Sequence, residues 1–282
     1  AMLLGFKQLK TRSLVMGLLK EGLKLARHQT YEHLKTGSSE LRFIAVDESE
    51  SLEQGTLLPV PLWERAKDLE RAELREHIGD AIPLKNNLLS DLLLRQGIYL
   101  DRYRLFSQTS REDFQLCFQS GEGQYWYLGS YADRESGIRA ANALRQLLIH
   151  LNSESEGLHL LEHILLRPLE GSDHEGRQPP PGEAFYAFRA SVLFPAWTAR
   201  CHDPQFRLLA EETVRLNTPS HIYVEFYWLE FHEMYEFETL YEKWLSLKSE
   251  EPADSMALNQ FSSSLIGFLL DIEKRREGDV SL

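Results

Sequence analysis

The chain has 282 residues, of which 43% are hydrophobic and 26% are charged, and its formal net charge is −12. These proportions are ordinary for a globular protein with one large core or two smaller ones. The negative charge argues against non-specific binding to nucleic acid, because contacts of Lys and Arg with phosphates supply most of that affinity. No apolar run reaches the roughly 18–20 residues that a membrane-spanning helix needs, and no signal peptide is expected at the start.

The N-terminal region carries a charge opposite to that of the rest. Residues 2–36 contain seven basic residues but only two acidic ones. Leucines recur near helical spacing over residues 3–35, which predicts an amphipathic helix, and Gly17 and Gly22 allow a break into two shorter ones. We expect its apolar face to pack in the core; docking on an acidic protein or a membrane surface is the alternative. The candidate contact residues are Lys7, Lys10, Arg12, Lys20, Lys24 and Arg27.

The first half of the chain mixes short elements. We expect a strand at Leu41–Val46, a charged helix at Trp63–Ile78 and a helical turn or two at Leu88–Arg95. The clearest pattern follows, where apolar and polar residues alternate over Phe114–Phe118 and an aromatic run returns at Gln124–Leu128. Gly121 and Gly123 suit the turn of a hairpin between them.

A helix is expected to complete this ββα unit. Asp133 can cap a helix over Arg134–Leu151, whose apolar residues recur on one face. The run Leu158–Leu166 is bounded by Gly157 and Arg167-Pro168, a length that favours a buried strand.

The second half predicts a further α+β unit. Strands are expected at Phe185–Phe194 and His221–Trp228, with a helix between them at Pro204–Leu216 that Asp203 caps. Two helices, Glu230–Leu247 and Met256–Arg276, are expected to close the chain.

These elements predict an α+β fold with mixed or antiparallel sheets, helices packed on one face, and helical extensions at both ends. The expected domains are a mainly helical region over residues 1–110, a ββα unit with one more strand over residues 111–170, a Pro/Gly linker over residues 171–183, and an α+β domain over residues 184–282. The two cysteines, Cys117 and Cys201, form no disulfide framework or metal motif, so we expect buried free thiols and a cytoplasmic setting.

One string has the form of a catalytic motif. In His159-Leu160-Leu161-Glu162-His163 the histidines stand four residues apart, so on a helix both could bind one zinc ion, with Glu162 as the general base. The string resembles the zinc motif of insulinase-type metallopeptidases, a resemblance that implies His159 and His163 as ligands.

Three features argue against this hypothesis. The residues that follow the motif in that family are replaced here by Arg167-Pro168, and no pattern singles out a third ligand among Glu233, Glu236 and Glu238. In a strand, moreover, His159 and His163 would stand about 13 Å apart, too far for one ion. We therefore predict no cofactor and no metal.

Aromatic residues are dense between Tyr223 and Trp244. Their alternation in the strand and their helical spacing afterwards favour a core, with some of them at an exposed interface. The candidate partner contacts are Tyr227, Trp228, Tyr235 and Trp244.

Three segments in this order resemble the C-terminal region of large bacterial proteins associated with phage-tail-like contractile injection systems. They are Gly157–Pro168, Phe188–Trp197 with Asp203–Arg207, and Thr218–Leu229 with the aromatic helix that follows. The likeness covers about residues 114–247. It implies a non-enzymatic structural or adaptor protein of the bacterial cytoplasm that contacts other proteins and could be incorporated into a larger particle.

Overall fold

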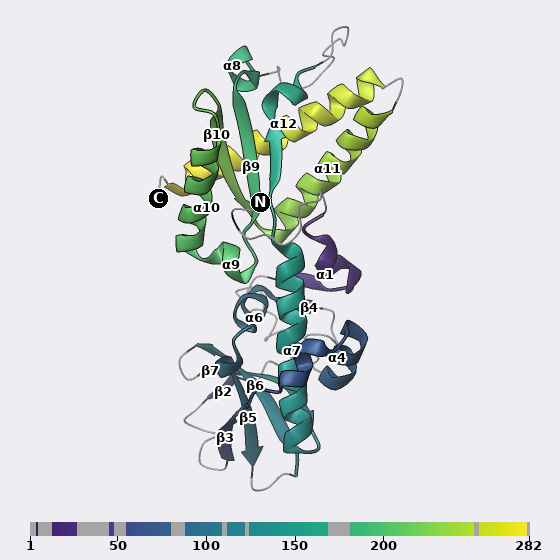
Figure 1. Cartoon of the computed structure of the whole chain (residues 1–282), viewed down its shortest axis with the longest axis vertical. Coiled ribbons are helices and arrows are strands. Elements are labelled where there is room, and N and C mark those ends of the chain that lie inside the picture. Colours follow the sequence, from purple (N-terminus) through teal and green to yellow (C-terminus); the bar gives the residue numbers. More distant parts are fainter. Residues whose placement is uncertain are drawn as a thin grey trace. The chain divides into compact units, whose positions relative to one another are not determined.

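The computed structural model describes residues 4, 13–26, 45–47, 55–79, 88–108, 112–121, 124–168, 181–250 and 254–280. The chain divides into two compact units (Figure 1). The first, here the N-terminal unit, comprises residues 16–156 and 197–203; the second, the C-terminal unit, comprises residues 1–15, 157–196 and 204–282. These bounds differ from the domain ranges expected from the sequence, and the expected linker falls mostly on residues that the structure does not describe.

The N-terminal unit is built on a five-stranded antiparallel sheet with the order β2-β7-β6-β5-β3. The predicted hairpin is confirmed as β6 (Phe114–Gly121) and β7 (Gln124–Tyr131), and the predicted helix as α7 (Arg134–Ser155). The Asp133 side chain accepts a hydrogen bond from the backbone N–H of Ser136, as expected of the cap. The other strands are β2 (Ala45–Asp47), β3 (Gly55–Pro59) and β5 (Tyr103–Gln108).

Shorter helices surround α7. The predicted helix over Trp63–Ile78 is interrupted: a 3-10 helix, η3 (Glu64–Asp68), precedes α4 (Arg71–Ile78). The predicted helix over Leu88–Arg95 begins three residues late, because Leu88–Ser90 form β4 and α6 spans Asp91–Gln96. The 3-10 helix η4 (Leu100–Arg102) leads into β5.

The prediction of a helix over residues 3–35 is wrong in the part that the structure describes. The helix α1 covers only Met16–Lys20, and the strand β1 (Lys24–Ala26) follows and pairs in parallel with β4. Gly22 has φ of +69°, a backbone conformation that costs glycine little and other residues more, so the chain turns there instead of continuing the helix. Gly22 therefore follows the end of α1 instead of lying within a longer helix.

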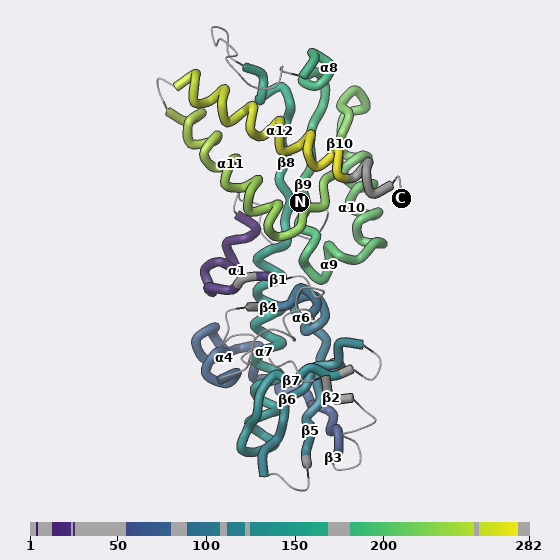
Figure 2. Tube along the Cα trace, turned by 180° about the vertical axis from the view of Figure 1, so that it is seen from behind, coloured from purple at the N-terminus to yellow at the C-terminus, as the bar shows by residue number. Residues whose placement is uncertain are grey.

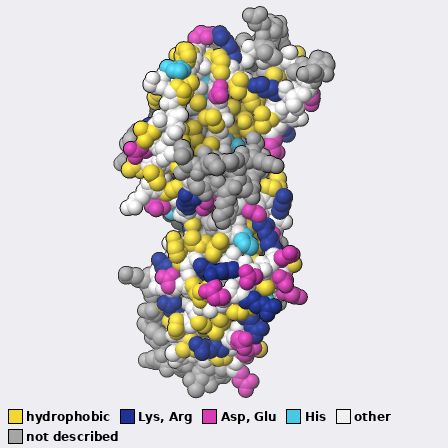
Figure 3. Space-filling view, viewed as in Figure 1, with side chains coloured by type: hydrophobic (Ala, Val, Ile, Leu, Met, Phe, Trp, Pro, Cys, Tyr) yellow, Lys and Arg dark blue, Asp and Glu magenta, His cyan; other side chains and the backbone are white. Residues whose placement is uncertain are grey.

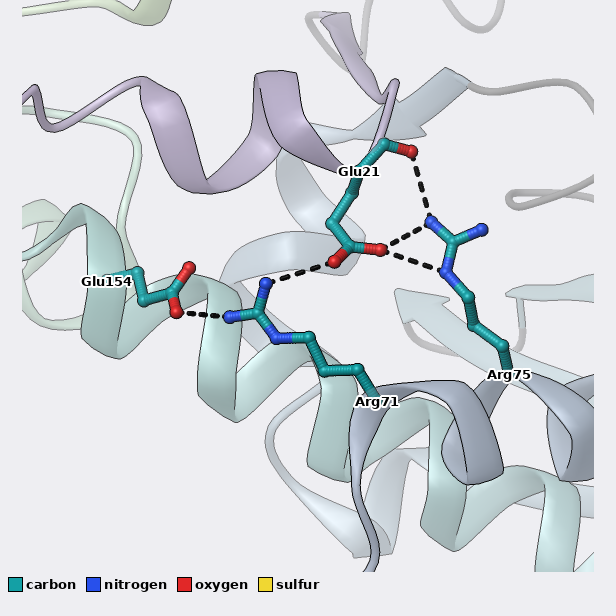
Figure 4. A network of polar contacts seen from close by, with 4 residues as sticks. All are labelled: Glu21, Arg71, Arg75 and Glu154. Carbon is teal, nitrogen blue, oxygen red and sulfur yellow. Dashed lines mark hydrogen bonds and ion pairs between the residues drawn. The ribbon is translucent and has the colours of Figure 1, made fainter.

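Charged side chains join this turn to α4 and α7 (Figure 4). The carboxylate of Glu21 accepts hydrogen bonds from Arg71 at 3.0 Å and from Arg75 at 2.5 and 2.9 Å. Arg71 also forms an ion pair with Glu154 of α7, and these two carboxylates raise the pKa of Arg71. Because the Glu21 side chain is only 12% exposed, its charge needs both arginines.

The C-terminal unit is built on a three-stranded mixed sheet with the order β10-β9-β8. The central strand β9 (Arg189–Pro195) pairs in parallel with β10 (Tyr223–Leu229) and antiparallel with β8 (His159–Glu162). Only the first half of the strand predicted over Leu158–Leu166 is therefore extended, since residues His163–Leu166 form the 3-10 helix η5. A short helix, α8 (Glu183–Tyr186), replaces the start of the predicted strand at Phe185.

Helices cover both faces of this sheet, whereas the sequence suggested one. The side chain of Trp228 contacts α10 (Pro204–Asn217), where its Nε1 donates to Glu211. The adjacent residue Tyr227 points the other way and donates to Glu273 of α12 (Ser255–Val280). With α11 (Phe231–Ser249), α12 forms the helical layer behind the sheet in Figure 1 and in front of it in Figure 2.

The α+β class is confirmed, with an antiparallel sheet in one unit and a mixed sheet in the other. The last three predicted helices are confirmed with bounds that shift by four residues at most. Among the described residues, no helix is both long enough and apolar enough to cross a membrane.

Gly97, the C-terminal cap of α6, is expected to be sensitive to a single added methyl group. A Cβ there would lie 2.4 Å from a methyl carbon of Leu148 and 2.5 Å from the carbonyl oxygen of Leu93, so Gly97→Ala should lower the free energy of unfolding by about 1–3 kcal/mol. Gly267, inside α12, has open space around it. Gly267→Ala should therefore raise the free energy of unfolding by about 0.5–1 kcal/mol, because alanine favours a helix. Urea unfolding of both variants checks the opposite signs; equal effects would contradict the packing described.

Candidate functional site

The histidines of the HxxEH string lie on one face of β8 and its extension. Burial alternates along the strand, so that His159 and Leu161 are buried while Leu160 and Glu162 are exposed. His163, the first residue of η5, is buried as well. The side chain of Glu162 therefore lies on the opposite face of the sheet from His159, where it could not act as the general base of a shared zinc site.

His163 is fully buried and both of its ring nitrogens have partners. Its Nδ1 lies 2.9 Å from the carbonyl oxygen of Phe185 and its Nε2 lies 2.7 Å from Oγ of Ser191. Because a carbonyl can only accept, Nδ1 carries the proton, and Nε2 of the neutral ring accepts from the Ser191 hydroxyl. Burial lowers the pKa of His163, which agrees with a neutral ring.

His159 belongs to a second polar cluster, centred on the buried carboxylate of Glu238 in α11. The Nε2 atom of His159 lies 2.8 Å from Oε1 of Glu238, and the backbone N–H of Leu14 donates to the same oxygen at 2.6 Å. The Ser13 hydroxyl donates to the other oxygen at 2.5 Å. The rings of Phe237 and Tyr241 pack around the imidazole at centroid distances of 5.5 and 5.8 Å. Glu238 is thus held by three donors and anchors the segment at Ser13–Leu14 to α11.

The side chains of His159 and His163 have different partners and do not converge on one point. One hydrogen-bonds to α11 and the other to β9 and α8, so the convergence that a zinc motif requires is not formed. Across the described ranges, no group of three or more His, Cys, Asp or Glu residues has a geometry that could hold a metal ion.

Ser191 and His163 have the separation of a nucleophile and its general base. Neither side chain is exposed to solvent. A substrate could not reach the hydroxyl, so the pair links β9 to η5 and stabilises the fold.

The opposite face of the same sheet is covered in part by α10 and by Leu4, which is 4% exposed. A cavity of about 650 Å³ lies there, and its walls are mainly apolar side chains of β8, β9, β10 and α10. The side chains of Leu160, Val192 and Val224 come from the three strands, and Val214 comes from α10. Hydrophobic side chains are visible over this face in Figure 3. A volume of this size lies within the range of about 300–1,000 Å³ that is typical of binding pockets.

A second apolar surface lies on α10. Phe206 and Ala210 of this helix are buried, yet Leu208, Leu209 and Leu216 are 68%, 56% and 78% exposed. At 100° per residue, these leucines fall within one arc of the helix surface, opposite the buried side. We call these three residues the leucine face. The exposed residue Glu212 lies within the same arc, so the face is apolar with a carboxylate among its leucines. Exposed apolar side chains that gather on one face are a feature of interaction sites.

The structure separates the predicted partner contacts. Tyr227 and Trp244 are each 2% exposed, so assigning them to a partner surface was wrong. Both side chains donate to residues of α12, Tyr227 to Glu273 and Trp244 to Ser262. Trp228 is half-buried under α10, and Tyr235 is exposed on α11.

Of the basic candidates, Lys20 is exposed at the end of α1. Lys24 lies in β1, with a side chain outside the described set. Lys7, Lys10, Arg12 and Arg27 lie outside the described residues altogether.

Sequence reasoning missed the residues that complete the two histidine clusters, Ser191 and Ser13, as well as the cavity and the leucine face. The leucine face could have been found in the sequence. An amphipathic helix needs apolar residues on one side only, and Leu208, Leu209 and Leu216 are additional apolar residues on the other side of α10. The serines have none, since their roles depend on strand pairing.

No model of a known protein family matches the chain, and no curated protein matches it significantly.

The neutral state of His163 predicts a pH dependence of stability. Its pKa is lower in the folded chain than the ordinary value of about 6.5, so the unfolded chain binds a proton that the folded chain does not. The free energy of unfolding should therefore fall as the pH drops below about 6.5, and this part of the slope should be absent in His163→Asn. Unfolding by urea at about pH 7.5 and pH 5.5 measures it; His221→Asn, at an exposed site, is the control. Identical slopes for wild type and His163→Asn would show that His163 is not held neutral.

The same geometry predicts little zinc. Protein purified without chelator should contain far less than one zinc per chain by plasma mass spectrometry, because His159 and His163 are committed to separate hydrogen bonds. Stoichiometric zinc that disappears in His163→Ala would contradict this description of the motif.

Proposed function

We propose that this chain is a non-enzymatic structural or adaptor protein that joins other proteins in a larger assembly, and that the assembly is a bacterial phage-tail-like contractile injection apparatus. The observation that carries the first part is the leucine face of α10. Burying such side chains gains roughly 1.5–3 kcal/mol each, so a partner helix or sheet that covers them would be held firmly.

The arrangement of polar groups supports the same proposal. The residues with catalytic potential are buried and paired: His163 with Ser191, and His159 with Glu238. The leucine face is exposed. Enzyme sites usually combine a pocket with accessible titratable groups. Here the accessible surface is suited to binding a protein.

The second part of the proposal rests on the resemblance of residues 114–247. The segments that carry it coincide with β8, β9, β10 and the start of α10, that is, with the framework that presents the leucine face. A protein-binding module at the C-terminus of large assembly proteins would need the sheet and α10 to hold its binding surface, but it would need no catalytic residues.

Substitutions on the leucine face test the proposal. The tagged chain, expressed in the organism that encodes it, should sediment with sheath and tube proteins that mass spectrometry identifies. The double variant Leu209→Asp/Leu216→Asp should reduce the sedimenting fraction by at least about tenfold, because charges would be buried in the interface.

Met256→Asp is the matched control, since Met256 is equally apolar and 79% exposed but lies at the start of α12. It should sediment like wild type. A wild-type chain that stays with the small proteins, or a double variant that sediments normally, would refute the proposal.

A further inference from the structure

The cavity of the C-terminal unit is open to solvent on the side of β8. On this face of the sheet, α10 covers β10, where Arg215 lies 4.7 Å from the Phe226 ring and Arg207 lies 4.9 Å from the Trp228 ring. At the β8 side, Leu160 and Ile164 line the cavity and are 53% and 48% exposed. The apolar surface of the sheet thus extends from the part under α10 to the exposed side chains of Leu160 and Ile164.

The strand β8 also has an available edge. It pairs with β9 alone among the described strands, so the backbone groups on its other side have no strand partner there. An extended segment added to such an edge gains main-chain hydrogen bonds, and every second side chain of the segment falls on the same face as Leu160.

The charge at the rim of the cavity is negative. Glu162 is exposed on the same face as Leu160, lines the cavity, and forms no ion pair with any described side chain. The nearby arginines are already neutralised, Arg189 by Glu225 and Arg167 by Glu183. A basic side chain directly across from Glu162 would complete a favourable cross-strand pair.

Phe188 adds an aromatic surface at the same cavity. It is 66% exposed, and its φ of +54° is unusual for a bulky residue. Strained backbone positions of this kind cluster at active sites and at sites that hold a ligand.

We propose that β8 and the cavity bind an extended segment of a partner protein. The segment pairs with the outer edge of β8, places alternate apolar side chains against Leu160 and in the cavity, and presents a Lys or Arg to Glu162. This inference rests on the proposed function in one respect only, that the occupant is a protein.

Selection from a phage-displayed library of random peptides on the purified full chain tests the proposal. The enriched peptides should alternate apolar residues and carry a Lys or Arg. Fluorescence polarisation with the synthesised peptides should show binding that Leu160→Asp weakens by at least about tenfold, while Met256→Asp leaves it unchanged. Selection on Glu162→Lys should enrich Asp and Glu in place of Lys and Arg.

Hydrogen exchange reports on the strand pairing itself. Bound peptide should slow the exchange of backbone amides in His159–Glu162, and far-UV circular dichroism should confirm that Leu160→Asp remains folded. Three results would overturn the proposal: no enriched peptide, peptides that bind Leu160→Asp as well as wild type, or binding without protection of β8.

The outcome is separable from that of the sedimentation experiment. Peptide binding by a chain that does not sediment with a large particle would leave this site standing and reject the assembly. Sedimentation without peptide binding would do the reverse.

Discussion

The structure of the C-terminal unit depends on the burial of β9 from both sides. From Ala190 to Pro195 every residue of this strand is buried, so both faces of a three-stranded sheet must be covered. On one face α11 and α12 provide the cover, and on the other α10 provides only part of it. The location of the polar clusters, the cavity and the proposed partner site all follow from this asymmetry.

Polar side chains on the well-covered face serve to join elements. His163 links η5 to α8 and β9, and Glu238 joins α11 to β8 and to the segment at Ser13–Leu14. A buried imidazole or carboxylate is costly unless each of its polar atoms has a partner. Once these partners are in place, the same groups specify a single register between strand and helices, and they are no longer available for chemistry.

The N-terminal unit shows a comparable use of charge. Glu21 lies at the turn after α1 and binds two arginines of α4, while Arg71 also reaches Glu154 of α7. These charged residues thus connect the turn after α1 to α4 and α7. Exposed pairs of this kind contribute little, but a carboxylate shielded from water depends on its partners.

Local patterns in the sequence determined the elements whose residues contact their near neighbours: the hairpin β6–β7, α7 with its Asp133 cap, and the helices α10, α11 and α12. Hydrophobic period and capping are local properties, so no tertiary information was needed for them. The extended state of His159–Glu162 was also predictable, because a short apolar run between Gly157 and Arg167-Pro168 leaves little room for a helix.

Only the tertiary structure decided what these elements do. It placed Tyr227 and Trp244 in the core, ended the first helix at Lys20, and gave His163 and His159 separate partners from distant parts of the chain. It also left Leu160 beside a cavity and the leucines of α10 on the surface. A sequence pattern states which side chains share a face, but whether that face is covered depends on residues far away along the chain.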